Sequence, residues 1–301
     1  MYCLHPISVR KWKGDLVKVK TNEYHYVPCG KCVACLARRR DEWKYRLSKE
    51  RDMSDYSFFL SNTYDNQHIP IRIKDNTPYF VFDKSHAQKY IKRVRYFLSQ
   101  ISDQLKMTYL CVSEYGGLGH RPHLHFLVFF KGDPYHKHMK QVREILRNTW
   151  LHGFLCIEYP EDGRIHYITK YCVKNLDQTP EDCIDPVFIL ASKRPYLGAP
   201  YADILEKQLD ASLLPTVFYR GHQQAMPRIF RQKLGAAGMP GSEMSDHDPR
   251  LHKKLESSFM QAFMRNRKSF DQADFAKYCN SRLANIEKLA IMRQLQRNES
   301  L

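Results

Sequence analysis

The 301-residue sequence contains no run of apolar residues long enough to span a bilayer, and its first residues lack the apolar core of a signal peptide. We also find no internal repeat and no low-complexity tract. With 43% hydrophobic and 13% aromatic residues, the composition is that of a globular protein with room for one large domain or two modest ones. We therefore expect a soluble protein made in a cytoplasm, with no membrane partner.

Acidic residues are few relative to basic ones: 32 Asp and Glu face 48 Lys and Arg, which gives a net charge of +16. This excess favours a polyanionic partner, and nucleic acid is the commonest one. An anionic membrane surface is the weaker alternative, because no basic helix with a clean apolar face is evident. A basic surface that only contacts water is a further alternative, which composition alone does not exclude.

Nine cysteines without an export signal indicate a reducing compartment, where clustered thiols are metal ligands more often than disulfides. Cys29, Cys32 and Cys35 form a C-x₂-C-x₂-C motif, and Cys3 can supply a fourth thiolate. We favour a structural Zn²⁺ site, with an iron–sulfur cluster or unliganded thiols as alternatives. Four dispersed cysteines are expected in the core: Cys111, Cys156, Cys172 and Cys183.

Hydrophobic periodicity predicts strands and helices in alternation through the first 175 residues. Strands are expected at 56–64, 107–114, 122–130 and 154–159, and helices at 32–51, 84–105, 134–150 and 165–173, with a turn at 161–163. From residue 55 to 175 the order β, α, β, β, α, β, α predicts an α+β fold with a ferredoxin-like antiparallel sheet flanked by helices.

Composition along the chain predicts three parts. Residues 1–54 form a basic arm with the cysteine cluster and an Arg-rich helix, and residues 55–235 form the main domain. Residues 236–301 form a linker followed by a basic helical region.

The segment Arg121-Pro122-His123-Leu124-His125 contains an H-x-H motif on a predicted strand. Alternation places both imidazoles on one face, about 7 Å apart. Pairing of this strand with the preceding one across a Gly-rich loop would bring Glu114 beside them. Two imidazoles and a carboxylate suit a divalent ion that still binds phosphate oxygens, Mg²⁺ or Mn²⁺. Two histidines on a half-exposed strand and a solvated carboxylate are the alternative interpretation.

A doubled Tyr-x-x-Lys pattern follows, in which Tyr167 and Tyr171 share one helix face, and Lys170 and Lys174 repeat the same offset. A phenol with an ordinary pKa near 10 needs help to act as a nucleophile. A nearby ammonium favours the phenolate and can hold a phosphate oxygen. Core tyrosines with outward-pointing lysines are the alternative.

These motifs resemble the HUH endonucleases that initiate rolling-circle replication, and most closely the replication initiators of microviruses, in the gokushovirus branch. The histidine motif and the tyrosine helix carry the resemblance, and further segments along the chain extend it: Pro28–Cys35, Glu42-Trp43, Thr63-Tyr64-Asp65, Ser113–Gly116, Ser192–Pro195 and Met226-Pro227-Arg228. One segment departs from the family: Leu60–Tyr64 reads Leu-Ser-Asn-Thr-Tyr, where a more apolar run is expected.

The resemblance implies that His123, His125 and Glu114 bind the metal, and that Tyr167 and Tyr171 alternate as nucleophiles. One tyrosine would cut a single-stranded origin in the cytoplasm of a bacterial host. The products would be a 5′-phosphotyrosine and a free 3′-OH that primes a host polymerase, with a host helicase as a further partner. The second tyrosine would cut the regenerated origin, and the released 3′-OH would close the circle.

For DNA binding we expect phosphate contacts from Arg38, Arg39, Arg40 and Arg121. Two other classes of protein remain as alternatives: another HUH enzyme, either a transposase or a relaxase, and a non-catalytic zinc-dependent DNA-binding module.

Overall fold

The structure is a computed structural model, and it describes residues 7–10, 24–27, 29–117, 119–173, 185–208 and 216–230. The chain divides into two compact units, one of residues 1–39 with 235–301 and one of residues 40–234. In the smaller unit, β1 (Ile7–Arg10) pairs antiparallel with β2 (Tyr24–Val27). The predicted helical region at 236–301 lies outside the described residues.

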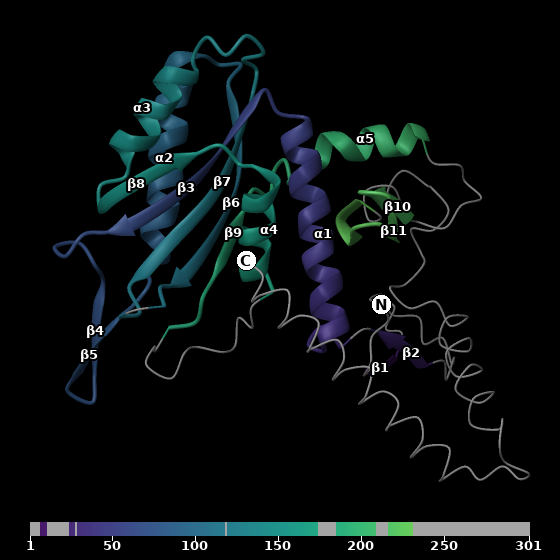
Figure 1. Cartoon of the computed structure of the whole chain (residues 1–301), viewed down its shortest axis with the longest axis horizontal. Coiled ribbons are helices and arrows are strands. Elements are labelled where there is room, and N and C mark those ends of the chain that lie inside the picture. Colours follow the sequence, from purple (N-terminus) through teal and green to yellow (C-terminus); the bar gives the residue numbers. More distant parts are fainter. Residues whose placement is uncertain are drawn as a thin grey trace, which may run out of the picture. The chain divides into compact units, whose positions relative to one another are not determined.

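A five-stranded antiparallel sheet forms the centre of the larger unit, in the order β8-β3-β7-β6-β9 (Figure 1). Its strands are β3 (Tyr56–Tyr64), β6 (Lys106–Tyr115), β7 (Pro122–Lys131), β8 (Gly153–Glu158) and β9 (Ile189–Ala191). The strands that are first to fourth along the chain lie in the order fourth, first, third, second across the sheet, which is the ferredoxin-like arrangement. The predicted α+β fold is therefore confirmed, with β9 added at one edge.

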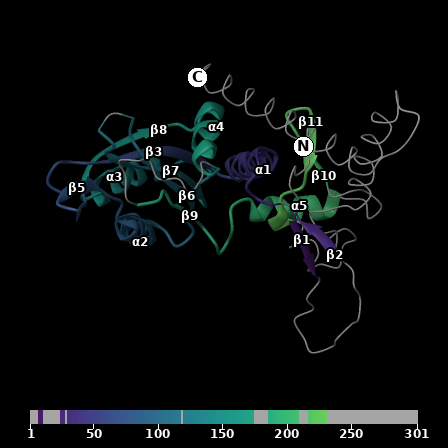
Figure 2. The same cartoon turned by 90° about the horizontal axis from the view of Figure 1, so that it is seen from below.

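Four helices accompany the sheet: α1 (Val33–Asp52), α2 (Lys84–Ile101), α3 (Met139–Thr149) and α4 (Asp162–Tyr171). Helices α2 and α3 cover one face, while α4 and the part of α1 that belongs to this unit cover the other (Figures 1 and 2). Because side chains alternate along each strand, the two faces feed two separate cores. One core takes Leu124, Phe126 and Val128 of β7, and the other takes Leu127 and Phe129.

A buried carboxylate anchors α1 to the sheet. Glu50, which is 1% exposed, accepts hydrogen bonds from the Thr108 hydroxyl (2.7 Å), the Lys131 ammonium (2.8 Å) and the Gly198 backbone N–H (2.6 Å). A buried charge of this kind is tolerated only with such partners.

The structure corrects two predicted boundaries. The third helix begins at Met139 and not at Pro134, because the Asp133 carboxylate accepts the backbone N–H groups of Lys137 and His138 and holds the preceding segment as a turn. The predicted turn at 161–163 is instead the start of α4, where Asp162 sits in the first helical turn and is paired with Arg51 at 2.8 Å.

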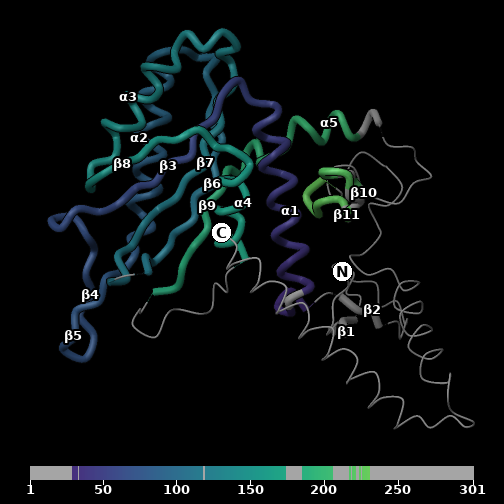
Figure 3. Tube along the Cα trace, viewed as in Figure 1, coloured from purple at the N-terminus to yellow at the C-terminus, as the bar shows by residue number. Residues whose placement is uncertain are grey.

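Several elements were not predicted from the sequence. A hairpin of β4 (Ile71–Lys74) and β5 (Thr77–Phe80) follows β3 and stands out from the sheet (Figure 3). After α4 come β9, α5 (Ala199–Gln208), and a second hairpin of β10 (Thr216–Tyr219) and β11 (His222–Ala225).

Candidate active site

Strand pairing brings the predicted metal ligands together on one face of the sheet. Glu114 on β6 is the register partner of His123 on β7, and His125 lies on the same face two residues further along. The Glu114 Oε2 and His125 Nε2 atoms are 2.8 Å apart, and the two imidazole rings are nearly parallel with centroids 6.5 Å apart. The hairpin predicted between these two strands therefore forms, and it places Glu114 beside the H-x-H motif.

The Nδ1 atoms of the two histidines are held by hydroxyl groups of β3. Ser61 Oγ lies 3.2 Å from His125 Nδ1, and Thr63 Oγ1 lies 3.2 Å from His123 Nδ1. Both pairs are direct register partners between β3 and β7. With Nδ1 engaged, the Nε2 atom of each ring is the nitrogen left to bind a metal, which is the usual outer-shell arrangement at metal-binding histidines.

Ser61 and Thr63 lie in the segment that departs from the apolar run expected in the family. The polar residues of this departure are the ones that orient the imidazoles. The signal was their spacing: two hydroxyls at alternate positions of an aromatic strand match the spacing of the two histidines.

Helix α4 places both tyrosines over this face. The Tyr167 hydroxyl donates to Glu114 Oε2 at 3.1 Å, and the Tyr171 hydroxyl donates to Glu114 Oε1 at 2.5 Å. The two phenol rings are 5.2 Å apart between centroids, and both contact the ring of His125. Ile165 and Ile168 on the same helix are buried in the core below, which fixes the face that α4 turns to the sheet.

The contacts at this carboxylate shift the pKa values of its partners in opposite directions. Burial works to raise the pKa of Glu114, but hydrogen bonds from His125 and Tyr171 outweigh it and the pKa falls below its usual value. Burial raises the pKa of Tyr167 and of Tyr171, and the negative charge of Glu114 raises both further. Without another cation at the site, both tyrosines are neutral phenols at neutral pH.

The donor set fits a divalent ion, although its three ligand atoms are not yet gathered. In the part of the chain that the structure describes, only the cysteine cluster brings three ligand atoms to within 4.8 Å of one another. Glu114 and His125 are already in contact, so a turn of His123 toward them is needed for one ion to reach all three. Burial, followed by the nearby His125, lowers the pKa of His123, which favours the neutral imidazole that a metal binds.

Gly116 makes room for His123 at the end of β6. A Cβ added at this glycine would lie 2.9 Å from His123 Nε2, closer than any ordinary contact. The sequence showed Gly116 only as part of a loop, and the structure assigns it to the wall of the site.

The two predicted lysines are placed differently by the structure. Lys170 lies on the side of α4 that carries His166, whose pKa is lowered to about 4 by burial and by the charges of Lys44, Arg40, Lys170 and Arg220. The cation that favours the Tyr167 phenolate is Arg164, which precedes it on α4. The role of Lys170 stays a prediction, and Lys174 lies outside the described residues.

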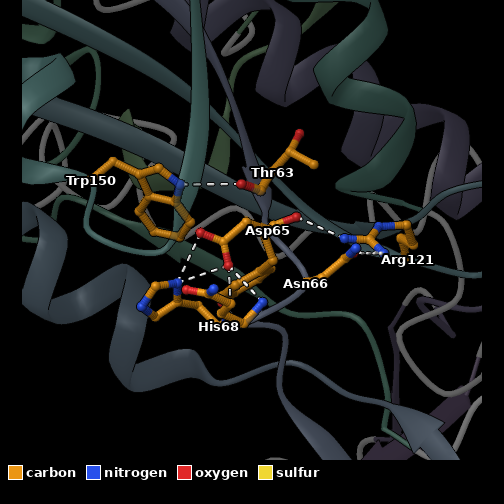
Figure 4. Close-up of polar contacts among 8 residues, drawn as sticks. Thr63, Asp65, Asn66, His68, Arg121 and Trp150 are labelled. Atoms are coloured by element: carbon orange, nitrogen blue, oxygen red, sulfur yellow. Dashed lines mark hydrogen bonds and ion pairs between the residues drawn. The ribbon is translucent and has the colours of Figure 1, made fainter.

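Arg121 is held at the entrance to the histidine strand. Its guanidinium donates to the Asn66 Oδ1 atom at 3.0 Å and to the Tyr64 carbonyl at 2.9 Å (Figure 4). Asp65 shapes the loop that carries Asn66, because its carboxylate accepts the backbone N–H groups of Gln67 and His68. Arg121 is therefore oriented beside the site, and its DNA contact stays a prediction.

The three arginines of α1 differ in exposure: Arg38 is half-buried, Arg39 is exposed and Arg40 is 8% exposed. Their DNA-binding role also stays a prediction.

The thiols of Cys29, Cys32 and Cys35 form a group that can hold a metal ion, with all three Sγ atoms within 4.8 Å of one another. Backbone N–H groups of Lys31 and Cys32 donate to Cys29 Sγ at 3.5 and 3.3 Å, and such bonds favour a thiolate. Cys3, the proposed fourth ligand, lies outside the described residues, as does Cys183. Of the cysteines expected in the core, Cys111 and Cys172 are buried, but Cys156 is exposed on the edge strand β8.

In the described part of the chain, no helix is both long and apolar enough to cross a membrane.

A ferredoxin-like sheet whose histidine strand lies under a two-tyrosine helix defines an α+β protein of the HUH type. Comparison with known proteins agrees with this class. The family model of the replication-associated protein ORF2 matches residues 57–176, from β3 to just beyond α4.

Two curated proteins are similar along the sequence. The chain is 28% identical over 302 residues to the replication-associated protein VP4 of Bdellovibrio phage phiMH2K, an alignment that covers 94% of this chain and 90% of the relative. It is 27% identical over 160 residues to the replication-associated protein ORF4 of Chlamydia phage 1, covering 49% of this chain and 38% of the relative. The chain belongs to the replication-associated proteins of microviruses, and the resemblance predicted from its motifs is confirmed.

Among solved structures, the chain is similar to the N-terminal nuclease domain of non-structural protein 1 of minute virus of mice. The match has 9% identity and a TM-score of 0.19, and it covers 57% of this chain and 82% of the other. A likeness this weak carries no argument about the fold or the site.

Proposed function

We propose that the protein nicks and rejoins single-stranded DNA at a replication origin, with Tyr167 and Tyr171 as alternating nucleophiles. One observation carries this proposal: both phenol hydroxyls and the Nε2 atom of His125 meet at the single carboxylate of Glu114. Two core tyrosines would have no reason to share one half-buried carboxylate with an imidazole.

The two tyrosines are close to equivalent, which suits alternating roles. Each hydroxyl bonds a different oxygen of Glu114, and the rings lie side by side one helical turn apart. A phosphate that approaches one hydroxyl is therefore also near the other. A second cut at the regenerated origin then needs no rebuilding of the site.

The residues Glu114, His123 and His125 would hold Mg²⁺ or Mn²⁺. Such an ion would polarise the scissile phosphate and oppose the effect of the Glu114 charge on the phenol pKa values. The phenol oxygen attacks phosphorus, the bond from phosphorus to the 3′ oxygen breaks, and that oxygen leaves as a 3′-OH with the proton. The resulting 5′-phosphotyrosine conserves the phosphodiester bond energy, so attack by a 3′-OH can reseal the strand without ATP.

In the cell, the free 3′-OH would prime a host polymerase, and a host helicase would supply further single strand. We place this activity in the cytoplasm of the bacterial host. The cysteine cluster would bind a structural Zn²⁺, and Lys170, Arg121 and the arginines of α1 would contact DNA phosphates.

The test is adduct formation on labelled single-stranded oligonucleotides tiled across the genome that encodes the protein. With Mn²⁺ or Mg²⁺, a protein–DNA adduct should survive denaturation, and mass spectrometry should find it on Tyr167 or Tyr171. The adduct should be lost in the Tyr167→Phe, Tyr171→Phe double variant and after chelation. Tyr135→Phe, at an 82% exposed tyrosine away from these contacts, should leave it unchanged. An adduct that persists in the double variant would refute the proposal.

A further inference from the structure

The face of the sheet that carries the histidines continues onto the edge strand β8. Thr63 and Ser61, which hold the histidines from β3, have Phe154 and Cys156 as their register partners on β8. Register partners in an antiparallel pair point to the same face. Phe154 therefore lies about 10 Å from the column of His123 and His125, two strand spacings away.

Phe154 is unusually exposed for a phenylalanine in a sheet. Its side chain is 71% exposed, and Cys156 beside it is also exposed. The intervening Leu155 and Ile157 point to the opposite face and pack on the core under α2 and α3. Among the described residues, no aromatic ring contacts Phe154, whereas the aromatic residues of β3 and β7 are buried.

Helix α4 leaves this edge uncovered because it packs over the central strands. Its buried residues join Leu110 and Val112 of β6 and Leu127 of β7 in one core. At the far end of the β8 face, Arg164 lies 5.2 Å from the centroid of the Phe59 ring and pairs with Glu158. The surface thus consists of an exposed aromatic ring and a cationic group, and it is continuous with the proposed active site.

We propose that the exposed face of β8 binds the single strand next to the scissile phosphate, with a base stacked on Phe154. This inference rests on the proposed function, since the active site defines where the strand runs. The occupant is single-stranded DNA because its bases present flat apolar faces that duplex DNA keeps paired, and stacking on aromatic side chains is how proteins bind such strands. A net charge of +16 favours the same partner.

The first test measures affinity in a background that does not cleave. In the Tyr167→Phe, Tyr171→Phe protein, a fluorescein-labelled strand of about twenty thymidines is titrated by anisotropy. Phe154→Ala should weaken binding about tenfold, the size of one lost base–aromatic stack. Phe154→Trp should restore it. Phe97→Ala, which removes a 45% exposed phenylalanine on the outer side of α2, should have no effect. Equal affinities for the Phe154→Ala and Phe97→Ala proteins would overturn the proposal.

The second test needs no substitution at β8. Because Cys156 lies beside Phe154 on the same face, the same thymidine strand should slow alkylation of its thiol by iodoacetamide, read by peptide mass spectrometry. Unchanged alkylation at saturating DNA would overturn the proposal even if the adduct forms normally. Conversely, loss of binding in Phe154→Ala without any adduct from the wild type would leave this surface intact and refute only the nicking mechanism.

Discussion

Removal of the two β3 hydroxyls should weaken metal binding without unfolding the site. In the Ser61→Ala, Thr63→Ala variant, both imidazoles lose the group that fixes Nδ1 at 3.2 Å. Each such hydrogen bond contributes about 1 kcal/mol, or about fivefold in affinity. Two bonds on separate ligands together predict a loss of about thirtyfold, within the roughly 10- to 100-fold range seen for outer-shell changes.

The assay is calorimetric titration with Mn²⁺, which reads binding and not turnover. The matched control is Ser57→Ala, at a serine of the same strand and the same face whose partner on β7 is Phe129 and not a histidine. Circular dichroism would check that all variants stay folded. Equal Mn²⁺ affinity in the double variant and in Ser57→Ala would refute the role assigned to the hydroxyls.

Buried charges and thiols give three further predictions. Glu50→Ala should lower the free energy of unfolding by about 3 kcal/mol, measured by urea denaturation, because it leaves the Lys131 ammonium and buried donors without their acceptor; a change below about 1 kcal/mol would contradict this. Glu114→Gln should lower the pKa of Tyr171, measured by ¹³C NMR of labelled tyrosine, because a negative charge that raises it is removed; the pKa should stay above its ordinary value because burial is the larger cause. Cys32→Ser should reduce bound zinc, measured by elemental analysis of purified protein, and an unchanged zinc content would exclude the thiol cluster as its site.

Local patterns were sufficient for the elements of the central sheet. The predicted strand at 56–64 matches β3, and those at 107–114 and 122–130 match β6 and β7 to within one residue at each end. These strands have strong apolar character because they are covered on both faces, so their signal survives in the sequence alone. The hairpin of β4 and β5 was missed because its residues are mostly exposed and carry no such pattern.

For the site, residue types and their spacing could be read from the chain alone: two histidines two apart on a strand, and two tyrosines four apart on a helix. Those spacings fix a shared face in each element, because the periods of strand and helix are local properties of the backbone. The neighbours of these residues, in contrast, became known only from the folded chain. The hydroxyls of Ser61 and Thr63, the meeting of both tyrosines at Glu114 and the exposed Phe154 depend on sheet register and on how α4 packs. Register and packing join segments that are far apart in the sequence, and no local pattern encodes them.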